Sequence, residues 1–214
     1  MKTNCPDSGT LKIYLIRHAE TEWSLSGQHT SRTDLPLTCH GEEMALELKP
    51  FLAPMDFSTV LTSPKLRARK TCEIAGLGER SEIELDLAEW NYGYYEGLSS
   101  SEIRHTRWAW SVWRHGCPGG DSPSFTSDRA DRLIARLCRL TGNVALFSHG
   151  QFSRVLAARW LGLPSREGRH FTMDPASVSI LGYESGSTSQ RVISLWNALP
   201  NSLVGSEHFE FSRP

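Results

Sequence analysis

The sequence predicts an α/β protein of three layers (α/β/α), in which helices cover both faces of a mostly parallel central sheet. Short apolar runs typical of buried strands recur along the chain, and segments with helical periodicity lie between some of them. Strands that alternate with helices favour a parallel sheet. The predicted strands are residues 11–16, 58–63, 82–87 and 143–148.

Three helices are indicated by capping residues and by periodicity. They are expected within residues 37–52, 63–76 and 151–162. Thr38 is the expected N-cap of the first. Ser63 is the expected N-cap of the second, with Pro64 at its first helical position and Gly76 at its end. The third has apolar residues at helical spacing and stops at Gly162.

Two further segments depart from the strand–helix alternation. Residues 177–196 contain two β-like runs around the Ser/Gly-rich turn 184–190, which predicts a C-terminal β-hairpin at the sheet edge. The Trp- and Gly-rich segment 98–128 predicts a short cap inserted over the sheet. We expect residues 1–214 to form one domain, with the tail after Pro200 loosely held.

Composition narrows the class of protein. A hydrophobic share of 39%, a charged share of 22% and a net charge of −1 are typical of an ordinary globular chain without a basic excess. We therefore expect no nucleic-acid or membrane partner. The five scattered cysteines suggest neither a disulfide framework nor a zinc site, and the N-terminus lacks a signal-peptide pattern. Reduced thiols and a cytoplasmic location are the expectation.

The dipeptide Arg-His occurs four times, and its position distinguishes one copy from the others. Only the first directly follows a predicted buried strand, which places it where open α/β sheets bind ligands. Two of the others lie in the predicted cap and one follows Pro164. The copies are Arg17-His18, Arg104-His105, Arg114-His115 and Arg169-His170.

Other strand ends also deliver charged or titratable groups. Arg67 follows the strand 58–63, Glu89 follows the strand 82–87, and His149 follows the strand 143–148. Two arginines and two histidines that converge on one crevice predict an anion site, and helix N-termini would add backbone N–H donors. A carboxylate at the rim of that site would be placed to carry a proton.

Together with the residues around them, these groups make the sequence resemble the histidine phosphatase superfamily, whose fold is that of phosphoglycerate mutase. The matching stretches follow the family's order over most of residues 11–160, and details resemble the branch that contains sedoheptulose-1,7-bisphosphatase. The stretches are "LIRHAETEW", "LPLTCHGEEMA", "TSPKLRARKT", "LAEWNYGYYEG" and "ALFSHGQFSRVLA". One position departs: Ala19 stands where the family usually has glycine, which would cause strain if φ there were positive.

The residue types suit transfer of a phosphoryl group. A neutral His18 can attack phosphorus and form a phosphohistidine. Arg17, Arg67 and a protonated His149 would neutralise the phosphoryl oxygens. Glu89 would protonate the leaving alkoxide and then activate water. No metal or other cofactor is expected.

Candidates for substrate binding are less specific. Polar residues after the nucleophile motif fit a pocket lining, although loop polarity explains them nearly as well, and a surface role for Arg154 competes equally with a grip on a second phosphate. The cap tryptophans Trp108, Trp110 and Trp113 are expected to serve packing. The substrate-binding candidates are Ser24, Gln28, Thr30, Tyr95 and Arg154.

The predicted function is that of a metal-independent phosphatase acting on a small phosphorylated metabolite, a sugar phosphate or bisphosphate. Three alternatives stay open: a phosphoglycerate mutase of the same fold, a non-catalytic module that binds a phosphorylated ligand, and a protein phosphatase. The "YYEG" stretch, the short cap and the retained core residues favour the first interpretation over all three.

Overall fold

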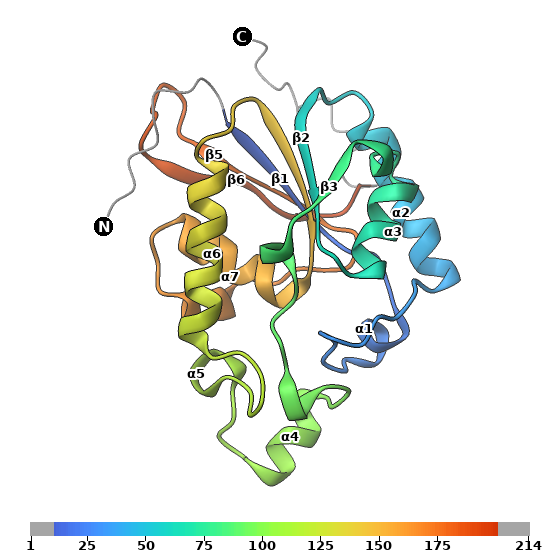
Figure 1. Ribbon diagram of the computed structural model, residues 1–214, viewed down its shortest axis with the longest axis vertical. Helices are drawn as coiled ribbons and strands as arrows, with labels where there is room; N and C mark the ends of the chain where they lie inside the picture. The colour runs from blue at the N-terminus through green and yellow to red at the C-terminus, as the bar shows by residue number, and fades with distance from the viewer. Residues whose placement is uncertain (1–10, 201–214) are drawn as a thin grey trace.

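The computed structural model of the chain describes residues 11–200 and places a six-stranded sheet between two layers of helices (Figure 1). The strand order is β3-β2-β4-β1-β5-β6. β1, β2, β3 and β4 pair in parallel, whereas β5 pairs antiparallel with β1 and with β6. The strands are β1 Lys12–Arg17, β2 Phe57–Thr62, β3 Ser81–Ile83, β4 Asn143–Ser148, β5 Val178–Tyr183 and β6 Arg191–Ala198.

The helices divide between the two faces of the sheet. The helices are α1 Glu22–Ser26, α2 Cys39–Leu52, α3 Leu66–Ile74, α4 Ser100–Thr106, α5 Val112–His115, α6 Pro123–Leu137 and α7 Gly150–Trp160. The 3-10 turns are η1 Gly78–Arg80, η2 Leu85–Leu87, η3 Gly93–Tyr95 and η4 Ser165–His170. α6 and α7 pack on one face, and α2 and α3 pack on the other. The predicted three-layer architecture is therefore confirmed.

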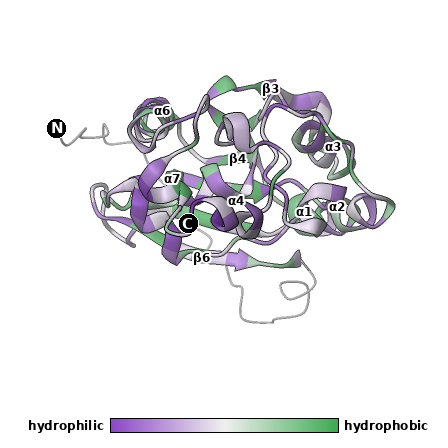
Figure 2. Cartoon of the chain, turned by 90° about the horizontal axis from the view of Figure 1, so that it is seen from below, coloured by the Kyte–Doolittle hydropathy of each residue, from purple (hydrophilic) through white to green (hydrophobic). Residues whose placement is uncertain are grey.

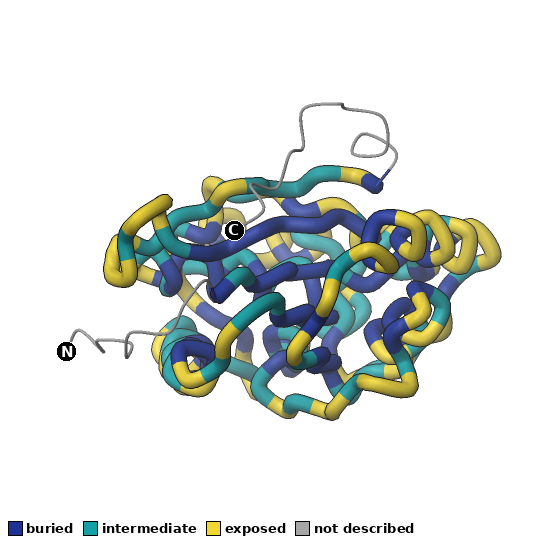
Figure 3. The backbone as a smooth tube through the Cα atoms, turned by 90° about the horizontal axis from the view of Figure 1, so that it is seen from above, coloured by how far each residue is buried: buried dark blue, intermediate teal, exposed yellow. Residues whose placement is uncertain are grey.

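Side-chain alternation along β1 explains why both faces are covered. Ile13 and Leu15 belong to the core under α6 and α7, whereas Tyr14 and Ile16 belong to the core under α2 and α3. All four are almost completely buried. Successive side chains of a strand point to opposite faces, so a central strand that is apolar throughout requires helices on both sides. In Figure 3 the buried stretches of the backbone run through the middle of the molecule.

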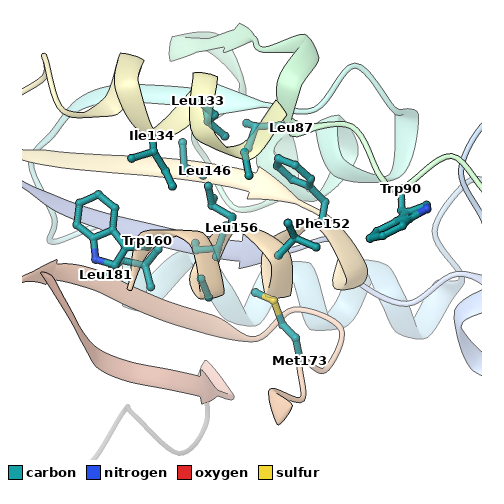
Figure 4. Close-up of a cluster of buried hydrophobic side chains, with 14 of the residues drawn as sticks. Leu87, Trp90, Leu133, Ile134, Leu146, Phe152, Leu156, Trp160, Met173 and Leu181 are labelled. Carbon is teal, nitrogen blue, oxygen red and sulfur yellow. The ribbon is translucent and has the colours of Figure 1, made fainter. Parts of the chain in front are cut away.

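The core under α6 and α7 is the larger of the two. Figure 4 shows Leu133 and Ile134 of α6 facing Leu156 and Trp160 of α7, with Leu181 of β5 close by. α6 was not among the predicted helices, although Ser122 caps it and a proline occupies its first turn. It begins inside the segment 98–128, so the cap segment, as the structure has it, is residues 98–121 with α4 and α5. Figures 1 and 2 place α4 at the end of the sheet where β1 terminates.

Two predicted elements differ from the structure. The strand expected over residues 82–87 ends at Ile83, and η2 follows. Ile83 and Leu85 are exposed at this sheet edge, and the Glu84 side chain accepts a hydrogen bond from the backbone of Asp86, which favours the turn. α3 begins at Leu66 rather than Pro64, because the carboxylate of Asp34 accepts the Leu66 N–H at 2.7 Å and caps the helix from another segment.

The other end signals are confirmed. Thr38 caps α2 by accepting the backbone N–H of Gly41 at 2.9 Å. Gly76 follows α3 with φ +85°, a conformation that glycine adopts readily. The hairpin of β5 and β6 lies at the sheet edge as expected. The residues after Pro200 lie outside the described part of the chain.

Cysteine chemistry and membrane contact were also predicted. Cys39, Cys72 and Cys117 carry free thiols, whereas Cys138 is disulfide-bonded, which corrects the expectation that every cysteine is reduced. Within residues 11–200, no helix has the length and apolar character needed to cross a bilayer.

Candidate active site

The two strand-end histidines lie side by side. β1 and β4 are parallel neighbours with Arg17 opposite Ser148, so the residues that follow them emerge at the same edge of the sheet. The backbone N–H of His18 donates to the carbonyl of Ser148 at 2.9 Å. The ring centroids of His18 and His149 are 5.2 Å apart, and both residues are buried. Parallel pairing thus brings together residues that are more than a hundred positions apart in the sequence.

The hydrogen bonding of His18 assigns its tautomer. Its Nδ1 atom lies 2.7 Å from the carbonyl oxygen of Ala19, and a carbonyl only accepts, so Nδ1 carries the proton. Burial lowers the pKa of His18 well below 6.5, and the positive charges of Arg67 and Arg17 lower it further. The imidazole is therefore neutral near pH 7, with the lone pair on Nε2.

Ala19 fits its position without backbone strain. Among residues 11–200, the non-glycine residues with positive φ are Ala176 and Asn197, and Ala19 is not one of them. Its N–H donates to the hydroxyl of Thr71 on α3 at 3.0 Å. The backbone at Ala19 is not left-handed, so replacing the family's usual glycine with alanine causes no strain there.

Two arginines flank the histidines, one half-buried (Arg17) and one fully buried (Arg67). Arg67 on α3 is 0% exposed, and its two terminal nitrogens donate to the carbonyls of Thr33 and Thr30 at 3.2 and 3.1 Å. Arg17 donates to the carbonyl of Met173 and lies against Gly150, where a Cβ would come within 3.2 Å of the guanidinium. Burial lowers the pKa of both arginines, and Glu89 opposes that shift. Guanidinium groups remain charged in proteins, so the pocket is cationic.

His149 contacts a serine and is buried among cationic groups. Its Nε2 atom lies 2.7 Å from the hydroxyl of Ser63, the residue that was expected to cap a helix. Burial lowers the pKa of His149 well below 6.5, and the charge of Arg67 lowers it further. In the protein alone His149 is therefore neutral near pH 7, whereas the protonated form expected from the sequence applies to the state with a phosphoryl group bound. A doubly charged anion beside it would favour the proton.

Glu89 sits against the first turn of α7. One carboxylate oxygen accepts the backbone N–H groups of Trp90 and Phe152, both at 2.8 Å, and the other accepts that of Gln151 at 3.0 Å. Arg129 on α6 donates to the backbone carbonyls of Ala88 and Glu89. The carboxylate is thus held in one orientation at the edge of the pocket. The groups that hold it and its backbone come from its own segment, from α6 and from α7.

A cavity of about 210 Å³ opens onto part of this cluster, whereas Arg67 and His149 are buried outside its lining. It is lined by both Arg17 and His18, by Glu89, and by four of the five substrate-binding candidates. The candidates among the lining residues are Ser24, Gln28, Thr30 and Arg154. Further lining residues that sequence reasoning did not select are Trp23, His29, Tyr92, Gln151 and Met173. Trp23 and His29 lie in the same stretch of sequence as the candidates Ser24 and Gln28, and this proximity could have identified them as lining residues.

Tyr95 lies outside this lining. Its ring packs edge-on against Trp110 with centroids 5.2 Å apart, and its hydroxyl accepts from Arg107 at 3.0 Å. Tyr92 occupies the wall instead. The cap tryptophans also divide: Trp110 is buried as expected, but Trp108 is 87% exposed and serves no packing.

Comparison with known proteins places this geometry in a family. The model of the histidine phosphatase superfamily (branch 1) matches residues 13–198, which is most of the chain. The chain belongs to the histidine phosphatase superfamily.

Individual relatives agree with that assignment. The chain is 40% identical over 188 residues to an acid phosphatase of Mycobacterium tuberculosis, with 86% of this chain and 92% of the relative covered. It is 36% identical over 186 residues to sedoheptulose 1,7-bisphosphatase of Saccharomyces cerevisiae, with 72% and 69% covered. Both relatives are named as phosphatases, and this chain is accordingly a phosphatase.

Solved structures show the same fold. An open-reading-frame product of Mycobacterium tuberculosis superposes with a TM-score of 0.83 at 38% identity, covering 88% of this chain and 98% of that one. A putative alpha-ribazole-5'-P phosphatase of Escherichia coli superposes with a TM-score of 0.76 at 26% identity, covering 89% and 97%. The mixed sheet with helices on both faces is therefore the fold of histidine phosphatases.

Proposed function

We propose that this histidine phosphatase hydrolyses a small phosphorylated metabolite, a sugar phosphate or bisphosphate, without a metal ion and through a phosphohistidine on His18. One observation carries the proposal. Arg17 Nε, Arg67 Nε and His149 Nδ1 are buried polar atoms with no hydrogen-bond partner among the described residues, as are Arg129 Nε and Ser153 Oγ. Buried polar groups are nearly always paired in proteins, so three such atoms around one nucleophile indicate a ligand with several acceptor oxygens. A phosphoryl group has that character.

The first half-reaction follows from the tautomer of His18. The Nε2 lone pair attacks phosphorus, a phosphorus–nitrogen bond forms, and the phosphorus–oxygen bond to the leaving group breaks. Arg17 and Arg67 stabilise the charge on the phosphoryl oxygens. Glu89, in its protonated form, gives its proton to the departing alkoxide.

The second half-reaction returns the enzyme to its starting state. Glu89, now a carboxylate, takes a proton from water as the water attacks phosphorus. The phosphorus–nitrogen bond breaks, inorganic phosphate leaves, and Nε2 regains its lone pair. With Nδ1 still protonated the phosphorylated ring is positively charged, and the carbonyl oxygen of Ala19, which accepts the Nδ1 proton, stabilises that charge.

Polar lining and Arg154 support a sugar phosphate as the substrate class. Ser24, Gln28, Thr30 and Gln151 offer hydroxyl and amide groups for a polyhydroxylated carbon chain. Arg154 adds a cation to the wall of the cavity. The yeast relative named sedoheptulose 1,7-bisphosphatase supports the bisphosphate option.

The test is a substrate screen of the purified chain. Sugar monophosphates, sugar bisphosphates, 3-phosphoglycerate and phosphotyrosine peptides would be compared by phosphate release at equal concentration, with His18→Ala as the blank. We expect the highest kcat/KM with a sugar phosphate or bisphosphate. Isomerisation of 3-phosphoglycerate without phosphate release would support a mutase instead, and no turnover of any phosphoester would support a binding module.

A further inference from the structure

Glu96 lies in the segment that follows Tyr92, outside the cavity lining, and its carboxylate is bound by a different loop. It accepts the backbone N–H of Ser31 at 2.8 Å and that of Thr33 at 3.0 Å, and also the hydroxyl of Ser31. Such charge-assisted hydrogen bonds are stronger than neutral ones. Glu96 therefore anchors residues 30–33, which we call the threonine loop.

The threonine loop is the part of the chain that holds Arg67. Its Thr30 and Thr33 carbonyls accept both terminal nitrogens of the buried guanidinium. With these two nitrogens engaged, the plane and direction of the guanidinium are set, and Nε is the atom left without a partner. The loop thus decides which way Arg67 presents its free donor.

One peptide group connects the two charges. The carbonyl of Thr30 and the N–H of Ser31 belong to the same peptide bond, so Glu96 accepts from one side of that group and Arg67 donates to the other. The peptide dipole is aligned between a carboxylate and a guanidinium, and hydrogen bonds in such a chain strengthen one another. Thr33 adds a second connection, because its N–H binds Glu96 and its carbonyl binds Arg67.

Neighbouring contacts keep the threonine loop in register with the Glu96 segment. The N–H of Gly97 donates to the carbonyl of His29 at 2.8 Å, and the N–H of His29 donates to that of Leu98 at 2.9 Å. The N–H of Tyr92 donates to the hydroxyl of Ser31 at 3.1 Å. Among the groups named here that hold the threonine loop to this segment, all within the described residues, Glu96 is the one carboxylate.

We propose that Glu96 is a positioning residue that orients the guanidinium of Arg67 toward the phosphoryl group by anchoring the threonine loop. The inference rests on the proposed function, because it assumes that Arg67 binds phosphate. Glu96 itself would not touch the substrate. A merely structural role would make the loss of Glu96 lower stability while the remaining folded enzyme kept its turnover.

The test compares Glu96→Ala and Glu96→Gln with a matched control, Glu102→Ala. Glu102 also accepts an N–H and a hydroxyl, both from Ser99, but it serves the first turn of α4. We expect Glu96→Ala to lower kcat about tenfold to hundredfold, the effect of one charge-assisted contact. Glu96→Gln should lose less, because its amide oxygen still accepts, and Glu102→Ala should stay within about twofold of wild type. Thermal melts would show that each variant is folded at the assay temperature.

A double-mutant cycle separates positioning from general loosening. Glu96→Ala would be repeated in an Arg67→Lys background, with Arg67→Met as a second background should the first fold poorly. If Glu96 acts through Arg67, its removal should change kcat by less than about twofold there, because coupled residues are not additive. Independent losses that multiply in the double variant would overturn the proposal, as would an unchanged kcat in Glu96→Ala.

Binding of inorganic phosphate provides a readout that needs no turnover. Isothermal titration should show weaker phosphate binding in Glu96→Ala than in wild type. The double variant should bind phosphate no more weakly than the Arg67 variant alone. An inactive wild type would contradict the proposed function but would leave this titration to decide the role of Glu96. An equal phosphate Kd for wild type and Glu96→Ala would overturn the positioning role.

Discussion

Nδ1 of His18 and the carbonyl oxygen of Ala19 are 2.7 Å apart, and this contact decides which ring nitrogen is nucleophilic. With the proton held on Nδ1, the lone pair of Nε2 is available at neutral pH. The same contact orients the ring, because the acceptor belongs to the backbone that follows β1. The ring nitrogen that keeps its lone pair is therefore set by main-chain geometry rather than by another side chain.

Removal of His18 should abolish turnover while the chain stays folded. Covalent catalysis cannot continue without the attacking nitrogen, so we expect His18→Ala to lose at least about a thousandfold in kcat. Phosphate release and a thermal melt would be measured on the same preparation, with the exposed His115→Ala as the control. Turnover of His18→Ala within tenfold of wild type would contradict the mechanism.

Substitution of Glu89 should matter most for poor leaving groups. A sugar alkoxide needs a proton as it departs, whereas p-nitrophenolate hardly does, and general acid catalysis contributes about 10²- to 10⁴-fold. Glu89→Gln should therefore lower kcat/KM far more for a sugar phosphate than for p-nitrophenyl phosphate. Glu82→Gln, at the exposed sheet edge, is the control. Equal losses on both substrates would remove Glu89 from the acid role.

Much of the fold was predictable because long apolar runs leave few options. β1 and β4 are buried on both faces, so their central residues 13–16 and 144–147 are apolar, and the residues after them had to lie at the ligand-binding edge. β3 was predicted too long because an apolar alternation at a sheet edge is not backed by burial: Ile83 and Leu85 are exposed. Edge strands receive less support from packing, and local side-chain bonds such as that of Glu84 then decide the backbone.

The site was predictable in its residue types but not in its detailed connections. Ser63 was placed at a helix cap because serine prefers that position. Its hydroxyl does accept the backbone N–H of Lys65 at 3.3 Å, but α3 begins only at Leu66, and the same hydroxyl lies 2.7 Å from Nε2 of His149. The choice between Tyr92 and Tyr95 depends on how η3 turns the chain, which no periodicity reveals. The charge of His149 depends on burial among cations from three segments, a property of the assembled fold.

Activity should persist in excess EDTA. In the proposed mechanism Arg17 and Arg67 supply the positive charge that a metal ion provides in other phosphatases, and residues 11–200 contain no group of three or more side chains suited to hold a metal. We expect equal kcat before and after dialysis against chelator, with a metal-dependent phosphatase treated in parallel. Loss of activity that Mg²⁺ or Zn²⁺ restores would assign the charge neutralisation to an ion.

Acidification should destabilise the protein partly through His29. Burial lowers the pKa of His29 from 6.5 to about 4, and Arg104 adds to this while Glu96 opposes it. The unfolded chain therefore binds a proton below pH 6.5 that the folded chain does not bind until about pH 4. Stability from this group is fully present above pH 6.5 and is lost as the pH falls toward 4, by about 2 kcal/mol at pH 5.

Urea unfolding at pH 7.5 and pH 5 would measure this contribution. The fall in unfolding free energy should be smaller in His29→Gln than in wild type by about that 2 kcal/mol, since the other titrating groups are common to both proteins. His105→Gln, exposed on α4, is the control and should follow wild type. The same pH dependence in His29→Gln and wild type would contradict the assignment.

We expect Arg154 to hold a second phosphate. Its guanidinium lies over the ring of Trp113 at 4.7 Å from the centroid and donates to Gly168, Arg169 and Gln151. These contacts engage three of the five N–H donors of a guanidinium and leave two for a ligand in the cavity that it lines. The side chain is held in place before substrate arrives, which reduces the entropy lost on binding.

Arg154→Ala should therefore raise KM for a sugar bisphosphate about tenfold to hundredfold while KM for the matching monophosphate changes little, the range expected for one charge-assisted contact. Arg159→Ala, on the same helix but paired with Asp131, controls for general weakening of α7. Steady-state kinetics on both substrates give the decisive ratio, because a packing defect would affect the two alike. Equal KM changes would return Arg154 to a role in supporting the loop around Gly168, and the bisphosphate preference would lose its cation while the phosphatase chemistry at His18 stayed intact.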